Sequence, residues 1–298
     1  MHVIDEVNFW RPSSQSRFRA LPTGGPFFLR LKHPLNAIAG FGFFAVDAQM
    51  SPEVAWEIFG EKNGDPDQQR FMQRIRRFRS YLRQGQARNV RANEPLSCLI
   101  LREVVFLPQS LWIPWERAEE WSPRVVDYKK YDLAAGPGRT LAELLRMSLV
   151  APAPDLARAF SPLVVRERPP VYRTVSERVG QGTFRARLMM AYESRCAVTG
   201  EHALPVLEAA HIQEYMGPAS NHLQNGLLLR ADLHRLFDRG YVTVTSDLRL
   251  EVSTRLKTEF ENGKIYYEMA GTHIRIPQAS DARPSHDALL WHAQNVFH

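Results

Sequence analysis

The segment from Leu204 to Gly240 constrains the fold more than any other part of the chain, because polar residues interrupt an otherwise apolar and turn-forming stretch. It opens with the apolar run LPVLEAAHI, which predicts a strand, and continues with the turn-forming MGPASNHLQNG. The run LLLRADLHRLFDRG then predicts a strand that turns into a short helix. The segment therefore predicts two strands and one helix that together carry His211, Asn225 and His234.

The predicted helix carries a histidine and an aspartate at a spacing that suits a shared cation. His234 and Asp238 are four residues apart, so their side chains project from one helix face about one turn from each other. An imidazole nitrogen and a carboxylate oxygen form a mixed ligand set for Mg²⁺ or Mn²⁺, with Ni²⁺ or Co²⁺ as further options, whereas a structural zinc site takes four closed ligands. The other interpretation of the pair is an ordinary surface contact.

His211 ends the apolar run before the turn, where an imidazole without a partner would be costly to bury. An imidazole with an ordinary pKa of about 6.5 can accept a proton at neutral pH, as the activation of a water molecule for attack on phosphorus requires. His211 is therefore a candidate general base. The other interpretation is a core histidine whose hydrogen bonds are satisfied within the protein.

The words AAHI, QNGLLL and DLHRLFD resemble the HNH endonucleases, in which a two-stranded hairpin packs on one helix around a single metal ion. The flanking RCAVTG and NGKIYYEM are similar to the subgroup attached to bacterial restriction proteins, and the resemblance covers most of residues 176–298. It implies that His211 is the general base, that Asn225 orients the loop between the hairpin strands, and that His234 and Asp238 bind the cation. The implied reaction is hydrolysis of a phosphodiester bond.

Two positions depart from the pattern of this family. Many HNH proteins have a further metal ligand directly before the general base, where this chain has Ala210. Glu208 lies on the same face of a regular strand as Ala210 and is the candidate substitute. Many relatives also bind a structural zinc through paired cysteines, but here Cys196 is followed by Thr199 in the place of the second cysteine, so we expect no structural zinc.

The chain has 298 residues, more than one hydrophobic core normally organises, so the length predicts two domains. Residues 1–133 combine strand-like runs with two helical segments, residues 134–175 are rich in proline and turns, and residues 176–298 hold the segment described above. We expect an α+β protein with domains at 1–133 and 176–298 and a helical linker between them.

Residues 7–47 and the sequence that follows resemble the EVE branch of the PUA-like fold, a β-barrel with inserted helices that reads modified bases. An early tryptophan with a polar loop, a Gly-Gly pair before an aromatic strand, and the strand AIAGFGFF carry this resemblance. It implies that a modified cytosine, 5-methyl or 5-hydroxymethyl, swings out of the duplex and stacks on aromatic side chains. The candidate base-binding residues are Trp10, Ser13, Phe41, Trp112 and Trp115, although core packing is the better interpretation of Phe41.

The net charge of +6 favours a polyanionic partner such as nucleic acid. The arginine-rich segment RFMQRIRRFRSYLRQG predicts an amphipathic helix, and Arg74 and Arg77 are candidates for contacts with the DNA backbone. A charge run of this kind is otherwise a solvated helix face.

These features together predict a type IV restriction endonuclease that acts on double-stranded DNA with modified cytosine. Two alternatives stay open, a non-catalytic reader of modified nucleic acid and an HNH nuclease directed to RNA. The sequence contains no signal peptide and no long apolar segment, so we expect a cytoplasmic protein without membrane contact. One HNH centre cuts one strand, which makes a homodimer a reasonable expectation.

Overall fold

A computed structural model describes residues 2–13, 17–84, 94–115, 128–147, 160–162 and 180–298. The chain divides into two compact units, Met1–Ala153 and Pro154–His298, which we call the first and second unit. Each unit is described by itself below. Helices and strands are mixed in both, and every strand pairing among these described residues is antiparallel, which agrees with the expected α+β class.

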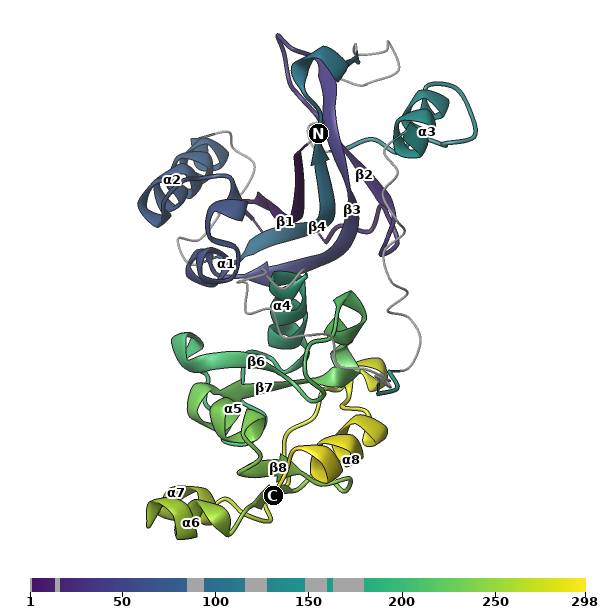
Figure 1. Cartoon of the computed structure of the whole chain (residues 1–298). Helices are drawn as coiled ribbons and strands as arrows, with labels where there is room; N and C mark the ends of the chain where they lie inside the picture. Colours follow the sequence, from purple (N-terminus) through teal and green to yellow (C-terminus); the bar gives the residue numbers. More distant parts are fainter. Residues whose placement is uncertain (1, 14–16, 85–93, 116–127, 148–159, 163–179) are drawn as a thin grey trace. The chain divides into compact units, whose positions relative to one another are not determined.

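The first unit is built on an antiparallel sheet in the order β1-β4-β3-β2 (Figure 1). Its strands are β1 (His2–Arg11), β2 (Pro26–Arg30), β3 (Ala37–Met50) and β4 (Leu96–Phe106), and the short β5 (Ile113–Pro114) pairs with the start of β3. Among the described residues this sheet is open and does not close into a barrel. The expected β-barrel of the first domain is therefore not formed by the part of the chain that the structure describes.

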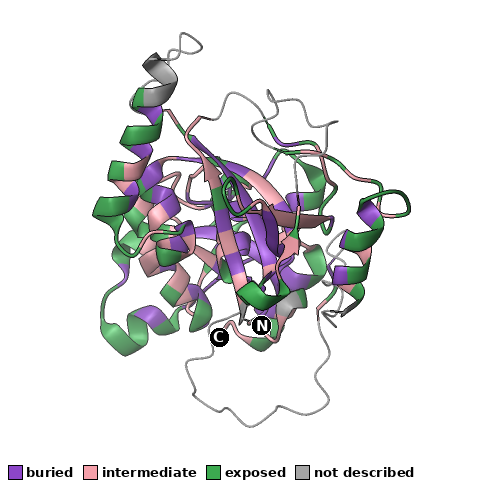
Figure 2. Cartoon of the chain, turned by 90° about the horizontal axis from the view of Figure 1, so that it is seen from above, coloured by how far each residue is buried: buried purple, intermediate pink, exposed green. Residues whose placement is uncertain are grey.

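The helices of the first unit follow the capping and periodic signals of the sequence. Helix α1 (Pro52–Phe59) begins with Ser51, whose hydroxyl accepts a hydrogen bond from the Val54 backbone, and a glycine with positive φ ends it. Helix α2 (Gln68–Gln84) buries Phe71 and Ile75, while the arginines of its other side are mostly exposed. Figure 2 shows this division between buried and exposed helix faces.

Helix α3 (Gly138–Met147) belongs to the first unit, although the sequence places it in a linker. Its Leu141 and Leu144 are buried in one hydrophobic cluster with residues of β3 and of the end of β4. Apolar side chains spaced three residues apart on a helix need such a surface to cover them. The expected linker of residues 134–175 therefore begins with a helix that packs on the sheet. The cluster consists of Ile38, Phe41, Val105, Leu107, Leu141 and Leu144.

The second unit contains the predicted arrangement of two strands and one helix. Strands β6 (Leu207–His211) and β7 (Gly226–Arg230) pair antiparallel, and helix α5 (Ala231–Asp238) begins at the next residue after β7 (Figure 1). Helix α4 (Gln181–Ala191) contacts both strands. The turn between the strands contains the 3-10 segments Pro218–Asn221 and Leu223–Asn225.

The remaining elements of the second unit follow α5 along the chain. Strands β8 (Val242–Val244) and β9 (Leu250–Val252) form the predicted hairpin. Helices α6 (Arg255–Phe260), α7 (Lys264–Tyr267) and α8 (His286–Asn295) complete the unit. Of these, α8 contacts β8 and stacks His292 on Phe237 of α5, so it supports the helix that carries His234.

Candidate active site

Helix α5 presents its polar side chains opposite a buried apolar face. Leu233 and Phe237 are buried, whereas His234 and Asp238 lie on the more exposed side of the helix. Because no linker separates β7 from α5, the position of His234 is set by the strand that precedes it. The hairpin then brings Glu208 of β6 next to His234, although the two residues are 26 positions apart in sequence.

The structure brings Glu208, His234 and Asp238 together around one imidazole ring. Glu208 Oε2 lies 2.7 Å from His234 Nδ1, and Asp238 Oδ2 lies 3.4 Å from His234 Nε2. The two carboxylates thus contact opposite nitrogens of the ring. A single cation cannot bind all three groups in this arrangement, and within the described residues no group of three His, Cys, Asp or Glu side chains is arranged to hold a metal ion.

The pair formed by His234 and Asp238 fits a divalent cation. Metal-to-ligand distances of about 2.0 to 2.2 Å at roughly right angles place two neighbouring ligand atoms about 3 Å apart. The observed separation of 3.4 Å is close to that distance. Two protein ligands leave several coordination positions for water and phosphate oxygens, as is usual for Mg²⁺.

His211 lies at the end of β6, on the other side of the strand from Glu208. The two residues are three positions apart, and side chains at an odd spacing in a strand point to opposite faces. The His211 ring stacks on Phe184 of α4 with centroids 4.2 Å apart, and its Nε2 lies 3.0 Å from Asn221 Oδ1. The side chain is buried, with 8% of the residue exposed. The contacts that the structure shows for His211 therefore lead to α4 and the turn, and the predicted convergence with His234 on one ion stays a prediction.

Asn225 ties the turn between the hairpin strands to the strand ends. Its amide group donates hydrogen bonds to the carbonyl oxygens of Gln213 and Ser220, each at 3.0 Å, and accepts one from the Gln213 backbone at 2.9 Å. The residue is completely buried. The predicted role of Asn225 in orienting this turn has these three hydrogen bonds as its structural basis.

Cys196 is buried in the turn that precedes the hairpin. Its sulfur accepts hydrogen bonds from the backbone of Thr199 at 3.5 Å and of Arg230 at 3.3 Å. The thiol thus joins the turn to the point where β7 meets α5.

Two residues of the site were missed from the sequence, Asn221 and Phe184, because a turn asparagine and a helical phenylalanine carry no local signal of contact with His211.

Three of the residues predicted to bind a base have other structural tasks in the first unit. Phe41 has no exposed surface and lies in the core, so it cannot stack on a base. Trp10 lies in β1 rather than in a loop, with its ring edge-on to Phe71 and its indole N–H donated to the Asn63 carbonyl. The Ser13 hydroxyl donates a hydrogen bond to Glu94 at 2.6 Å.

Trp112 and Trp115 are only partly buried. The Trp112 indole N–H donates a hydrogen bond to the Leu107 carbonyl, and the Trp115 ring lies edge-on to Tyr131. Both rings pack on the hydrophobic cluster that contains Phe41, and both retain some exposed surface. They remain candidates for contact with a base.

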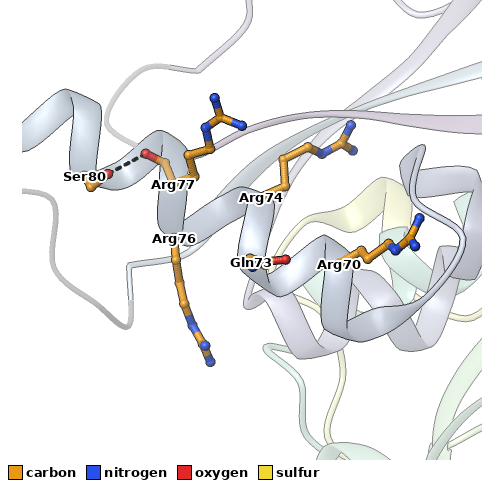
Figure 3. Close-up of a pocket in the computed structure, with 6 residues that line it drawn as sticks. All are labelled: Arg70, Gln73, Arg74, Arg76, Arg77 and Ser80. Atoms are coloured by element: carbon orange, nitrogen blue, oxygen red, sulfur yellow. Dashed lines mark hydrogen bonds between the residues drawn. The ribbon is translucent and has the colours of Figure 1, made fainter.

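The arginines of α2 line an open hollow of about 710 Å³ (Figure 3). Arg74 is already engaged, because its guanidinium contacts Asp65 at 2.7 Å, donates to the Asn63 carbonyl and lies over the Trp10 ring. Arg77 is exposed and points to the same side of the helix as Arg74. Within this hollow, the structure thus gives Arg74 a structural task, and Arg77 is an exposed residue.

Comparison with known proteins identifies the hairpin region. Residues 196–245 match the family model of the HNH endonucleases, whose members generally use a divalent metal ion. These residues include Glu208, His211, Asn225, His234 and Asp238. The match covers the strands β6 and β7 and the helix α5, so this part of the second unit is an HNH endonuclease domain.

One solved structure similar to the chain is described as a modification-dependent TagI restriction endonuclease. The similarity has 18% sequence identity and a TM-score of 0.29, and it covers 38% of this chain and 37% of that one. The chain thus spans little more than a third of that structure. No curated protein matches the sequence.

Among the described residues, no helix has the length and apolar character required to cross a lipid bilayer.

Proposed function

We propose that the chain is an endonuclease that hydrolyses phosphodiester bonds in double-stranded DNA carrying modified cytosine. The observation that carries the proposal is the arrangement of Glu208 on strand β6 with His234 and Asp238 on helix α5, within the segment that matches the HNH endonucleases. In this proposal the second unit cuts the DNA and the first unit selects it.

His234 and Asp238 would hold the divalent cation. Glu208 would then be a positioning residue rather than a ligand. A carboxylate at Nδ1 accepts a hydrogen bond from the N–H of that nitrogen, so the lone pair lies on Nε2 and faces Asp238, an arrangement common to metal-binding histidines. The cation, when bound, supplies a Lewis acid that neutralises charge developing on the phosphate.

His211 would be the general base that takes a proton from the attacking water. Its ring is held between Phe184 and the turn, and the neutral imidazole has one nitrogen that can accept a proton. The position of His211 at the end of β6 places it next to the turn that Asn225 fixes. Fixed orientation of this kind is what a general base contributes beyond its basicity.

The first unit would read the modified base by flipping it out of the duplex, as a PUA-like domain of the EVE type does. The support is the sequence resemblance together with the partly exposed rings of Trp112 and Trp115. Arg77 would contact a DNA phosphate, whereas Arg74 would act through the packing of α2 on Trp10. A homodimer would supply the two centres that a double-strand break requires.

The test is cleavage of plasmid DNA that contains cytosine, 5-methylcytosine or 5-hydroxymethylcytosine, with Mg²⁺, Mn²⁺ or a chelator. We expect metal-dependent nicking of the modified plasmids only. His211→Ala should lower the nicking rate by about 100-fold to 10,000-fold, the usual contribution of a general base, while binding to modified DNA is retained. Trp115→Ala should weaken that binding.

His286→Ala is the matched control, because His286 is exposed on α8 and should leave the nicking rate unchanged. If the His211→Ala variant nicks modified DNA at the rate of the wild-type chain, His211 is not the general base. Binding to modified DNA without any nicking would identify a non-catalytic reader instead. Cleavage of RNA in preference to either DNA would contradict the proposed substrate.

A further inference from the structure

Asn221 lies in the turn between β6 and β7 and contacts His211, the candidate general base, directly. Its Oδ1 lies 3.0 Å from His211 Nε2, and only 5% of the residue is exposed. We infer that Asn221 is a positioning residue that fixes His211 in the tautomer with hydrogen on Nε2, so that the lone pair lies on Nδ1. The catalytic consequence of this inference rests on the proposed function, whereas the tautomer itself does not.

The chemistry of the amide group determines the tautomer. An amide oxygen can only accept a hydrogen bond, so the imidazole nitrogen that faces it must carry the proton. The amide nitrogen of Asn221 lies close to Gly180, where an added Cβ would be 2.9 Å from Asn221 Nδ2. The nitrogen of the amide therefore faces Gly180 and the oxygen faces His211.

The ring of His211 is held in one orientation by its neighbours. Phe184 stacks on one face at an interplanar angle of 13°, and Tyr215 lies edge-on with centroids 5.9 Å apart. The backbone of His211 pairs with Gly226 at the end of the hairpin. Rotation of the ring by half a turn would break the buried hydrogen bond to Asn221, at a cost in free energy.

Asn221 is itself held in place by Asn225. The side chain of Asn225 donates a hydrogen bond to the carbonyl of Ser220, the residue before Asn221, and the Asn225 backbone donates one to the His222 carbonyl at 2.9 Å. Two hydrogen bonds thus fix the backbone on both sides of Asn221. The asparagine of the HNH pattern therefore acts on His211 through the turn.

This order of contacts assigns a direction to the proton transfer. Water gives one proton to Nδ1 of His211 as its oxygen bonds to phosphorus, and the bond from phosphorus to the leaving oxygen breaks. The leaving oxygen takes a proton from solvent. The imidazolium then keeps its Nε2–H bond to Asn221, which becomes stronger because the donor is charged.

The test is nitrogen-15 NMR of the full chain, with the His211 signals assigned by comparison with His211→Gln. We expect a protonated Nε2, an unprotonated Nδ1 and a resolved Nε2–H proton signal, because that proton is buried and hydrogen-bonded. In Asn221→Ala this proton signal should disappear through exchange with water. A protonated Nδ1 in the wild-type chain would overturn the inference, and so would an unchanged Nε2–H signal in Asn221→Ala.

Cleavage kinetics test the consequence for catalysis. Asn221→Ala should lower kcat for nicking of modified plasmid by about 10-fold to 100-fold with KM unchanged, since a general base contributes about 100-fold or more. Asn295→Ala is the matched control, because Asn295 is an exposed asparagine at the end of α8 whose amide donates a hydrogen bond to the Trp291 carbonyl. An unchanged kcat for Asn221→Ala would contradict the positioning role. If the unmodified chain cuts no DNA, the proposed function fails, and the NMR result still decides the tautomer.

Discussion

His292 of α8 shows how a single buried side chain can support the site from a distance. Its Nε2 donates a hydrogen bond to the carbonyl of Phe237, and its Nδ1 accepts one from the Thr243 hydroxyl at 2.8 Å. Its ring also stacks on Phe237 with centroids 3.7 Å apart. Phe237 lies next to Asp238, so His292 fixes the end of α5 that carries a candidate metal ligand.

Burial lowers the pKa of His292 from 6.5 to about 4, and the hydrogen bond to the Phe237 carbonyl only partly opposes this shift. The folded state therefore favours the neutral ring. The contribution of the neutral His292 ring to the free energy of unfolding is fully present above pH 6.5. It is lost as the pH falls from 6.5 toward 4, because the unfolded chain takes up the proton more readily. A shift of this size corresponds to about 3 kcal/mol of unfolding free energy.

We expect His292→Gln to destabilise the second unit at pH 7 by about 2 to 3 kcal/mol, and the difference from the unmodified chain to shrink at pH 4.5. Denaturant unfolding of the full chain at the two pH values measures this difference. His286→Gln, an exposed histidine of the same helix, is the control and should show a constant small effect. A difference that is the same at both pH values would contradict the role of His292 in pH-dependent stability.

At the scale of the element, the start of α5 is held by an ion pair instead of a capping side chain. Arg230 contacts both carboxylate oxygens of Asp232, at 2.7 and 2.8 Å, and the Tyr266 hydroxyl of α7 donates to the same carboxylate. The hydrogen bond from Arg230 lowers the pKa of Asp232 below its ordinary value. This stabilisation is present above pH 3.8 and is lost as the pH falls toward the lowered pKa.

Asp232→Asn should therefore weaken the junction between β7 and α5. We expect a loss of about 0.5 to 1 kcal/mol of unfolding free energy, since the pair is partly exposed and screened by solvent. We also expect a fall in metal affinity, because His234 and Asp238 lie on the same helix. Asp247→Asn, in the exposed turn between β8 and β9, is the matched control for unfolding and for Mn²⁺ titration. An equal effect of both substitutions would contradict the prediction.

The elements with a clear local signal could be predicted from the sequence. Helices α1, α2 and α5 follow from caps and apolar spacing, and strands β4 and β6 follow from apolar runs. The proline and polar residues that follow Trp10 indicate a loop, but pairing with β4 extends β1 past Trp10, which lies opposite Cys98. Pairing with a strand so distant in sequence has no local signature.

The site was predictable to the same degree. The spacing of His234 and Asp238 gives their shared helix face, and the structure has it. Glu208 contacts Nδ1 of His234, and this choice of ring nitrogen depends on how the hairpin packs against α5. No sequence pattern indicates that packing. The strand face on which His211 lies was predictable, in contrast. His211 and Glu208 are an odd number of positions apart in one strand, so their side chains point to opposite faces.

At the scale of the whole molecule, each unit has a core of its own. The first unit buries Phe41 in the cluster on its sheet, and the second buries Phe184, Leu233 and Phe237 around the hairpin. Units with separate cores can unfold separately. The division also separates the candidate base-binding residues from the HNH domain.

We expect two thermal transitions in calorimetry of the full chain. Phe41→Ala should lower one of them, since removal of a buried phenylalanine ring costs about 3 to 5 kcal/mol, and His292→Gln should lower the other. Phe9→Ala is the control for the first unit, because Phe9 lies on the same sheet with 46% of the residue exposed. A single transition lowered by both core substitutions would show that the units unfold together.

The direct passage from β7 into α5 limits which insertions this protein tolerates. One extra residue between Arg230 and Ala231 would rotate every later position of the helix by about 100° about its axis. His234 would leave the side of Glu208, while Leu233 and Phe237 would lose their cover. The turn of residues 212–225 is constrained as well, because Asn221 and Asn225 hold it by buried hydrogen bonds. Variation in length among natural or designed versions of this domain should therefore accumulate in the exposed turn between β8 and β9 and spare the strand-to-helix step.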